Sequence, residues 1–129
     1  MTVKGVGVDL VSVDRITRVY NRFPEKLIER IFTKDEKAQL KAKGSPMSMQ
    51  TLAARFAAKE AVLKAIGCGI GPAAMKDVEI IAPPGKQPAA RLHGVASFLA
   101  GKKNINNVFI SMSHEQNIAC AVATVTAQA

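Results

Sequence analysis

The most informative stretch of the sequence is SMQTLAARFAAKEAVLKAIG, residues 48–67. Its large apolar side chains recur at helical spacing and form one stripe, made of Leu52, Phe56, Leu63 and Ile66. Alanine is frequent between them, which favours a helix and lets it pack closely against a neighbouring element. Gly67 follows the last apolar residue, as is typical of a helix end. We therefore expect a long helix over residues 48–66 at the centre of the fold.

Shorter elements are expected on both sides of this helix. Residues 3–13 have a strand pattern that is apolar on both faces, as in a strand buried within a sheet. Helical spacing, Pro24 and a capping Thr33 predict three short helices, over residues 14–23, 25–32 and 34–43. Strands are predicted over residues 77–82, 89–92, 106–112 and 118–126, with a weak helix over residues 95–100. The expected fold class is α+β, with one domain over residues 1–129 and a mainly antiparallel sheet packed on the long helix.

Length and composition exclude several classes of protein. The chain has 129 residues, 48% of them apolar and 22% charged, which is typical of one globular domain and not of a disordered or fibrous chain. No apolar run approaches the ~18 residues that cross a bilayer, and the N-terminus lacks a signal-peptide pattern. We expect a cytoplasmic protein without membrane insertion, in which Cys68 and Cys120 are buried thiols.

The charge balance favours anionic partners. Lys and Arg number 18 against 10 Asp and Glu, which gives a formal net charge of +8. Nucleic acid is a weak candidate, because only 5% of the residues are aromatic and single-strand binders stack bases on aromatic side chains. Three arginines recur on one face of the first predicted helix: Arg15, Arg18 and Arg22. This arginine stripe is either a solvated face or a docking surface for an acidic partner.

Two acidic residues stand out by their setting. Asp9 lies inside an otherwise apolar strand, where an ionised carboxylate is costly unless it is paired, hydrogen-bonded or bound to a cation. It either caps a turn near the strand end or binds a hard cation such as Mg²⁺. Glu60 lies four residues before Lys64 on the long helix, so the two side chains share one face. They form either an ordinary surface pair or part of a phosphate and metal site.

Three more basic side chains are candidates for a phosphate site. Lys59 falls on the apolar stripe of the long helix, so it extends to the rim, points into a site or forms a structural ion pair. Arg55 lies at the edge of the same stripe. His114 ends a strand and begins the predicted connection over residues 113–117. It is either a hydrogen-bonded turn histidine or a group that contacts phosphate or transfers a proton.

A family resemblance rests on three segments: GVGVDLV at residues 5–11, RFAAKEAVLKAIG at residues 55–67, and SMSH at residues 111–114. Together they resemble the holo-[acyl-carrier-protein] synthases, the short type of 4′-phosphopantetheinyl transferase, over nearly the whole chain. Two turns depart from the family pattern. The common Gly-Thr-Gly is Gly-Cys-Gly at residues 67–69, and the usual Gly-Lys-Pro turn carries an extra Gln87.

The resemblance implies an activity and its partners. The family transfers 4′-phosphopantetheine from coenzyme A to a serine hydroxyl of apo acyl carrier protein, and adenosine 3′,5′-bisphosphate is the other product. It uses Mg²⁺ and forms homotrimers with active sites at the subunit boundaries. The same resemblance implies a cytoplasmic enzyme of lipid or related carrier-dependent synthesis.

The resemblance also implies residue roles. Asp9 and Glu60 would hold Mg²⁺ on the pyrophosphate of coenzyme A. Lys64 would lie beside the phosphates and act on the leaving oxygen, and either Glu60 or a metal-bound water would take the serine proton. Arg55 and His114 would help to hold the coenzyme A phosphates. The arginine stripe of Arg15, Arg18 and Arg22 would dock the acidic carrier.

Two other functions compete with this enzyme on the residues alone. A non-enzymatic module could bind an acidic protein through the arginine stripe, but it leaves Asp9 unexplained. A basic nucleic-acid-binding domain would show salt-sensitive affinity for generic oligonucleotides. The low aromatic content and the apolar setting of Asp9 disfavour it, so we expect an enzyme with no nucleic-acid partner.

Overall fold

The computed structural model describes residues 1–42, 47–68, 73–83 and 85–128. Their order along the chain is β1 (Thr2–Ser12), α1 (Val13–Arg22), α2 (Pro24–Ile31), α3 (Lys34–Ala42), α4 (Met49–Ile66), a 3₁₀ turn η1 (Met75–Asp77), β2 (Val78–Ile81), β3 (Ala89–Leu92), α5 (Gly94–Lys102), β4 (Asn107–Glu115) and β5 (Ile118–Ala127). The α+β class and the long helix are confirmed. Within these residues no helix is long and apolar enough to span a membrane.

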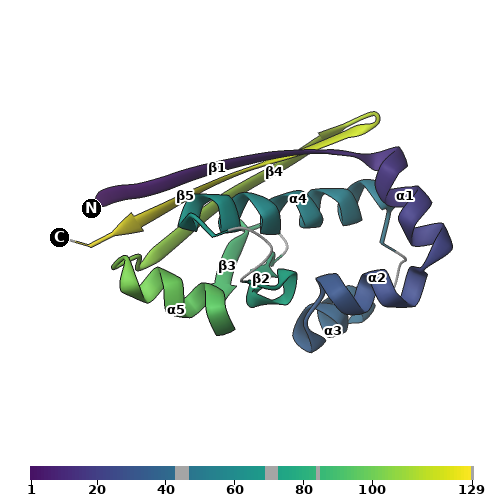
Figure 1. Cartoon of the computed structure of the whole chain (residues 1–129). Helices are drawn as coiled ribbons and strands as arrows, with labels where there is room; N and C mark the ends of the chain where they lie inside the picture. The colour runs from purple at the N-terminus through teal and green to yellow at the C-terminus, as the bar shows by residue number, and fades with distance from the viewer. Residues whose placement is uncertain (43–46, 69–72, 84, 129) are drawn as a thin grey trace.

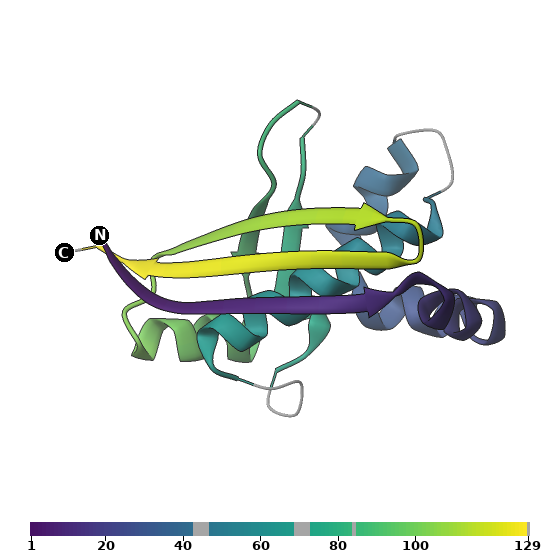
Figure 2. The ribbon, with the colours of Figure 1, turned by 90° about the horizontal axis from the view of Figure 1, so that it is seen from above.

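The strands form one antiparallel sheet in the order β1-β5-β4-β3-β2. The first and last strands pair along almost their whole length, from Thr2 opposite Ala127 to Ser12 opposite Ile118. This pairing brings the two chain ends together (Figure 1). Figure 2 shows β4, β5 and β1 in front of the helices, so the helices lie on one side of this part of the sheet.

Helix α4 lies directly against the sheet and buries 12 of its 18 residues. Sequence analysis predicted one apolar stripe, whereas the structure also buries the alanine-rich side of the helix. Ser48 begins the helix, because its hydroxyl accepts a hydrogen bond from the backbone N–H of Thr51. Gly67 ends it with a left-handed φ of 88°. The Nζ atom of Lys103 donates to the carbonyl oxygen of Ile66 in the last turn.

Two glycines let β1 approach α4 at backbone distance. A Cβ atom at Gly7 would collide with the carbonyl oxygen of Ala61, and one at Gly5 would collide with that of Ala65. The alanine side of α4 therefore rests directly on the strand backbone. Asp9 lies on the same face of β1, two residues beyond Gly7, and this contact places it beside α4.

The outer face of β1 differs from the prediction. A strand buried on both faces was expected, but Val6, Val8 and Leu10 are 63%, 54% and 67% exposed in the single chain. β1 is an edge strand of the sheet, and the described helices pack on its other face. The prediction was wrong for the single chain. An apolar pattern indicates that a strand face avoids water, but it does not show whether the same chain or another protein covers that face.

The hairpin between β4 and β5 is tighter than predicted. A connection over residues 113–117 was expected from their polar side chains, but β4 continues to Glu115 and β5 begins at Ile118. Only Gln116 and Asn117 form the turn, and Gln116 has a positive φ of 50°. Pairing with β5 extends the strand through residues whose own preference is for turns.

Candidate functional site

A cavity of about 510 Å³ opens between β1, α1, α2 and α4. Its charged side chains are Asp9, Arg15, Arg30, Glu60 and Lys64. Its apolar wall includes Phe56, Ile16, Val19, Leu27 and Met75. The structure thus brings Asp9 and Glu60 to one space, although 50 residues separate them in the sequence.

The α4 side of the cavity follows from helical geometry. Phe56, Glu60 and Lys64 are spaced four residues apart and line the cavity together. Between Leu52 and Ile66, these three are the residues that α4 does not bury completely, and Lys64 alone is classed as exposed. The cavity therefore occupies the one open side of an otherwise enclosed helix.

Asp9 and Lys64 form an ion pair at the edge of the cavity. The Nζ atom of Lys64 lies 2.9 Å from Oδ1 of Asp9 and also donates to the carbonyl oxygen of Val8 at 3.1 Å. The hydrogen bond to Asp9 and the charge of that carboxylate raise the pKa of Lys64. Lys64 therefore stays an ammonium group at neutral pH and presents positive charge to the cavity.

Glu60 is in an electrostatically unfavourable place. Burial raises the pKa of its carboxyl, the negative charge of Asp9 raises it further, and Lys64 opposes both effects. Two carboxylates that face one cavity and repel each other are a suitable donor set for a hard divalent cation. No third His, Cys, Asp or Glu joins them among the described residues. A cation held here would take its other oxygen ligands from water or from a bound phosphate, as Mg²⁺ commonly does.

Lys59 is not part of this cavity. Sequence analysis left three alternatives for it, the rim of the helix, a phosphate contact in the site or a structural ion pair, and the structure shows the ion pair. Its side chain is fully buried, and its Nζ atom donates to Oε1 of Glu36 and to the carbonyl oxygen of Ile31, both at 2.6 Å. Lys59 therefore points into the core on the α3 side of α4.

Arg55 also lies on the α3 side. It is 7% exposed, does not line the Asp9–Glu60 cavity, and is close enough to Glu36 for that carboxylate to oppose the lowering of its pKa by burial. Within one chain, the predicted cluster of Arg55, Lys59 and Lys64 is thus divided between two faces of α4. A role for Arg55 in binding phosphate stays a prediction.

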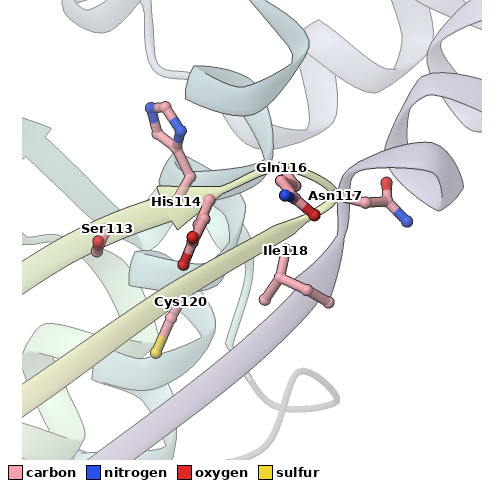
Figure 3. A pocket seen from close by; sticks show the side chains of 7 residues that line it. Ser113, His114, Gln116, Asn117, Ile118 and Cys120 are labelled. Carbon is pink, nitrogen blue, oxygen red and sulfur yellow. The ribbon is translucent and has the colours of Figure 1, made fainter.

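His114 lies at the hairpin and not in the cavity. It lines a separate open hollow of about 640 Å³ around the β4–β5 turn, together with Ser113, Gln116 and Cys120. Figure 3 shows His114 and Cys120 leaving opposite faces of the hairpin. In one chain His114 is therefore separate from the Asp9–Glu60 pair, and its role also stays a prediction.

The arginine stripe lies exposed on α1. Arg15 also lines the cavity, so the stripe begins at the cavity and continues away from it through Arg18 and Arg22. At its far end, Arg22 and Lys26 lie over the ring of Phe23, at 5.3 and 5.7 Å from its centroid. The surface is therefore basic with an exposed aromatic side chain.

Sequence analysis did not name several residues that line the cavity. Among them, Arg30 lies on α2 and Met75 on η1. The spacing of Lys26 and Arg30 was a weak signal that α2 carries a basic face. Nothing local in the sequence indicated that η1, which begins 44 residues after α2 ends, would reach the same cavity.

Comparisons with known proteins identify the family. The sequence model of the 4′-phosphopantetheinyl transferase superfamily matches residues 5–123. The chain is 40% identical over 119 residues to a holo-[acyl-carrier-protein] synthase of Natranaerobius thermophilus, covering 92% of this chain and 94% of that one. The crystal structure of the Neisseria meningitidis synthase is 32% identical and superposes with a TM-score of 0.84, covering 96% of this chain and 98% of that one. The Helicobacter pylori synthase, solved in complex with coenzyme A, is also 32% identical, with a TM-score of 0.78 over 94% of this chain and 99% of that one.

The chain belongs to the 4′-phosphopantetheinyl transferase superfamily. Within that superfamily its sequence and structural relatives are holo-[acyl-carrier-protein] synthases, and it is an enzyme of that type.

Proposed function

We propose that this enzyme moves 4′-phosphopantetheine from coenzyme A to a serine of an apo acyl carrier protein in a Mg²⁺-dependent reaction that releases adenosine 3′,5′-bisphosphate. The observation that carries the proposal is the meeting of Asp9 and Glu60 in one cavity beside the ammonium group of Lys64. The coenzyme A complex of the Helicobacter pylori relative supports coenzyme A as the donor.

Each group in the cavity has a role in this transfer. Asp9 and Glu60 would hold Mg²⁺, which when bound supplies positive charge that polarises the pyrophosphate. Lys64 would orient the phosphates and stabilise negative charge on the leaving bisphosphate as the P–O bond breaks. Either Glu60 or a water on the bound cation would take the serine proton.

The acidic carrier would dock on α1. The arginine stripe leads into the cavity through Arg15, so a carrier bound along it would bring its serine to the Asp9–Glu60 pair. The exposed ring of Phe23 at the far end offers an apolar contact between Arg22 and Lys26. Both features suit an acidic helix with an apolar stripe.

A homotrimer would complete the active site. The outer face of β1, β5 and β4 exposes a set of apolar side chains that a partner would cover: Val6, Val8, Leu10, Phe109, Ile118 and Val122. Arg55 and His114 do not line the cavity of their own chain. An active site at a subunit boundary, where one copy supplies His114 to the cavity of the next, accounts for both observations. A cytoplasmic location suits the described thiols Cys68 and Cys120, which are both unpaired.

A carrier-loading assay tests the proposal. Purified protein is mixed with apo carrier, coenzyme A and Mg²⁺, and mass spectrometry follows the gain of one phosphopantetheine arm and the release of the bisphosphate. Asp9→Ala and Glu60→Ala are expected to abolish loading, as is EDTA, with Mg²⁺ restoring the wild type only. Asp35→Ala, which removes an exposed acid from α3, is the matched control and should load normally. Unchanged loading by Asp9→Ala, or in EDTA, would overturn the metal site.

A further inference from the structure

A sealed polar network lies on another side of α4, about 100° around the helix from the open cavity. Glu36 is 1% exposed, and its Oε1 atom accepts hydrogen bonds from Lys59 and from the backbone N–H of Thr33. Its Oε2 atom accepts from the backbone N–H of Ile80, on the edge strand β2. One carboxylate thus joins α4, the start of α3 and the edge of the sheet.

The network holds Glu36 in a fixed position. Thr33 and Glu36 form a reciprocal cap, because the Thr33 hydroxyl accepts from the N–H of Glu36 at 3.1 Å while Oε1 of Glu36 accepts from the N–H of Thr33 at 2.9 Å. The same hydroxyl donates to Oε2 of Glu79 at 2.7 Å. Lys59 therefore binds an acceptor that three other backbone and side-chain groups already orient.

Small groups make the contact between α4 and the edge strand. The surface that meets β1 consists of alanines, among them Ala61 and Ala65, and the strand meets it with Gly5 and Gly7. This close contact fixes the distance between helix and strand. On another side of α4, the hydrogen bond from Lys59 to Glu36 adds a constraint that depends on direction, and so on the rotation of the helix.

We propose that Lys59 is a positioning residue, whose buried bond to Glu36 fixes the rotation of α4 so that Glu60 faces Asp9 across the cavity. Lys59 and Glu60 are adjacent and project about 100° apart on the helix, so holding one direction holds the other. The bond to the carbonyl oxygen of Ile31 ties the same ammonium to the end of α2, which also forms the cavity wall. This inference rests on the proposed function, since it concerns the same carboxylate pair.

The test removes the pair without leaving a buried charge. Lys59→Met alone would leave the Glu36 carboxyl group in the core without its ion-pair partner, which is strongly destabilising in comparable pairs. The double variant Lys59→Met/Glu36→Gln is therefore used, because replacing both partners of a buried pair by neutral side chains of similar volume commonly preserves folding. The matched control is Glu79→Gln, which weakens the same network at α3 and β2 without touching α4.

Three quantities are measured on the wild type and both variants: the thermal midpoint, the kcat and KM of carrier loading, and the affinity for Mn²⁺ by electron paramagnetic resonance as a substitute for Mg²⁺. The double variant is expected to unfold cooperatively. Its kcat should fall by about 10–100-fold, because misplacement of a reacting group produces an effect of this size. It should keep its KM for coenzyme A and carrier, and bind Mn²⁺ more weakly. Glu79→Gln should lower the thermal midpoint and leave kcat and Mn²⁺ affinity unchanged.

Two results would overturn the positioning role. One is wild-type kcat and Mn²⁺ affinity in a folded double variant. The other is a Glu79→Gln variant whose kcat and thermal midpoint both fall as much as those of the double variant. Lys59 would then be a stabilising residue only. Failure of the proposed function has a different signature, because the wild type itself would then neither load the carrier nor bind Mn²⁺, and the inference would fall with it.

Discussion

At the scale of single residues, neighbours in the sequence take opposite roles. Lys59 is sealed in the core, whereas Glu60 faces a cavity that substrate can enter. Lys59 has fixed hydrogen-bond partners. Burial lowers the pKa of its ammonium group, and the negative charge of Glu36 opposes that shift. Glu60 has an unfavourable setting that a bound cation would relieve. The side chain that is buried in the core and the side chain that faces the cavity therefore lie on different faces of one helix turn.

The buried network predicts a pH-dependent stability at Glu79. Its pKa is lowered, first by the hydrogen bond from the Thr33 hydroxyl and then by His93 and Arg91, while burial opposes the shift. A carboxyl whose pKa falls on folding contributes stability that is complete above its ordinary pKa of 4.5 and is lost as the pH falls through the lowered value. Glu79→Gln should therefore lower the thermal midpoint by several degrees at pH 7, since hydrogen bonds to charged groups contribute about 1.5–3 kcal/mol.

The difference between the two proteins should shrink as the pH falls below 4.5. Thermal unfolding at half-unit steps from pH 7 to pH 3 measures it. A difference between wild type and Glu79→Gln that stays constant with pH would show that the Glu79 charge contributes nothing.

The sequence carried part of this residue-scale information. Asp9, Glu60 and Lys64 were predictable because a charge in an apolar strand and a pair at helical spacing are local signals. The core position of Lys59 was not predictable, because its partner Glu36 lies 23 residues away in another helix. A lysine on an apolar stripe has the same pattern whether it reaches solvent, a ligand or a buried acid.

At the scale of elements, the contact between β1 and α4 brings Asp9 and Glu60 to one cavity. Gly7→Ala places a methyl group against the carbonyl oxygen of Ala61, in a contact that neither backbone can relieve without moving apart. Overpacking of this kind costs about 1–3 kcal/mol. We expect a lower thermal midpoint and a fall in kcat, because Asp9 moves away from Glu60 together with the strand. Thermal unfolding and the loading assay measure both.

Gly101→Ala is the control for that substitution. Gly101 lies in the last turn of α5, and a Cβ there meets no atom within 4 Å. Alanine is favoured over glycine within a helix by about 0.5–1 kcal/mol, so the control should be neutral or slightly stabilising and fully active. Equal behaviour of the two variants would contradict the close approach of β1 and α4.

Helix α1 should decide affinity for the carrier. Exposed charge pairs contribute only about 0.2–1 kcal/mol each, but reversing a charge replaces an attraction by a repulsion. Arg18→Glu is therefore expected to raise the KM for the carrier severalfold at low salt, and to leave the KM for coenzyme A unchanged. Steady-state kinetics with each substrate varied in turn gives the two constants.

Lys102→Glu provides the matched charge reversal. Lys102 lies on α5, at the opposite end of the molecule from α1 (Figure 1), and changes the net charge by the same amount. If both variants raise the carrier KM equally, the total charge of the protein attracts the carrier and α1 is not the docking surface.

The helices and strands themselves were largely predictable. Thr33 marked the start of α3, and Gly67 marked the end of α4. The end of β4 was missed because its last residues are polar, and only pairing with β5 keeps them extended. The burial of α4 on nearly all sides was missed because alanines carry too little hydrophobic signal to indicate a buried face.

At the scale of the whole molecule, the sheet is asymmetric. Helices cover one face of β1, β5 and β4, and the opposite face exposes apolar side chains over all three strands. An exposed apolar area of this kind favours association, and identical chains commonly associate into closed symmetric assemblies. The predicted trimer therefore concerns this exposed apolar face of the sheet.

Val6→Asp tests whether this surface assembles the enzyme. Val6 is 63% exposed at the middle of β1 and points away from α4, so aspartate there should leave the fold of one chain intact while a partner would have to bury its charge. Light scattering after size exclusion should show the mass of three chains for the wild type and of one for the variant, and carrier loading should fall with the trimer because His114 no longer reaches a neighbouring cavity. Phe98→Asp, an equally exposed change on α5, should keep both properties. A fully active Val6→Asp monomer would mean that one chain contains the complete active site.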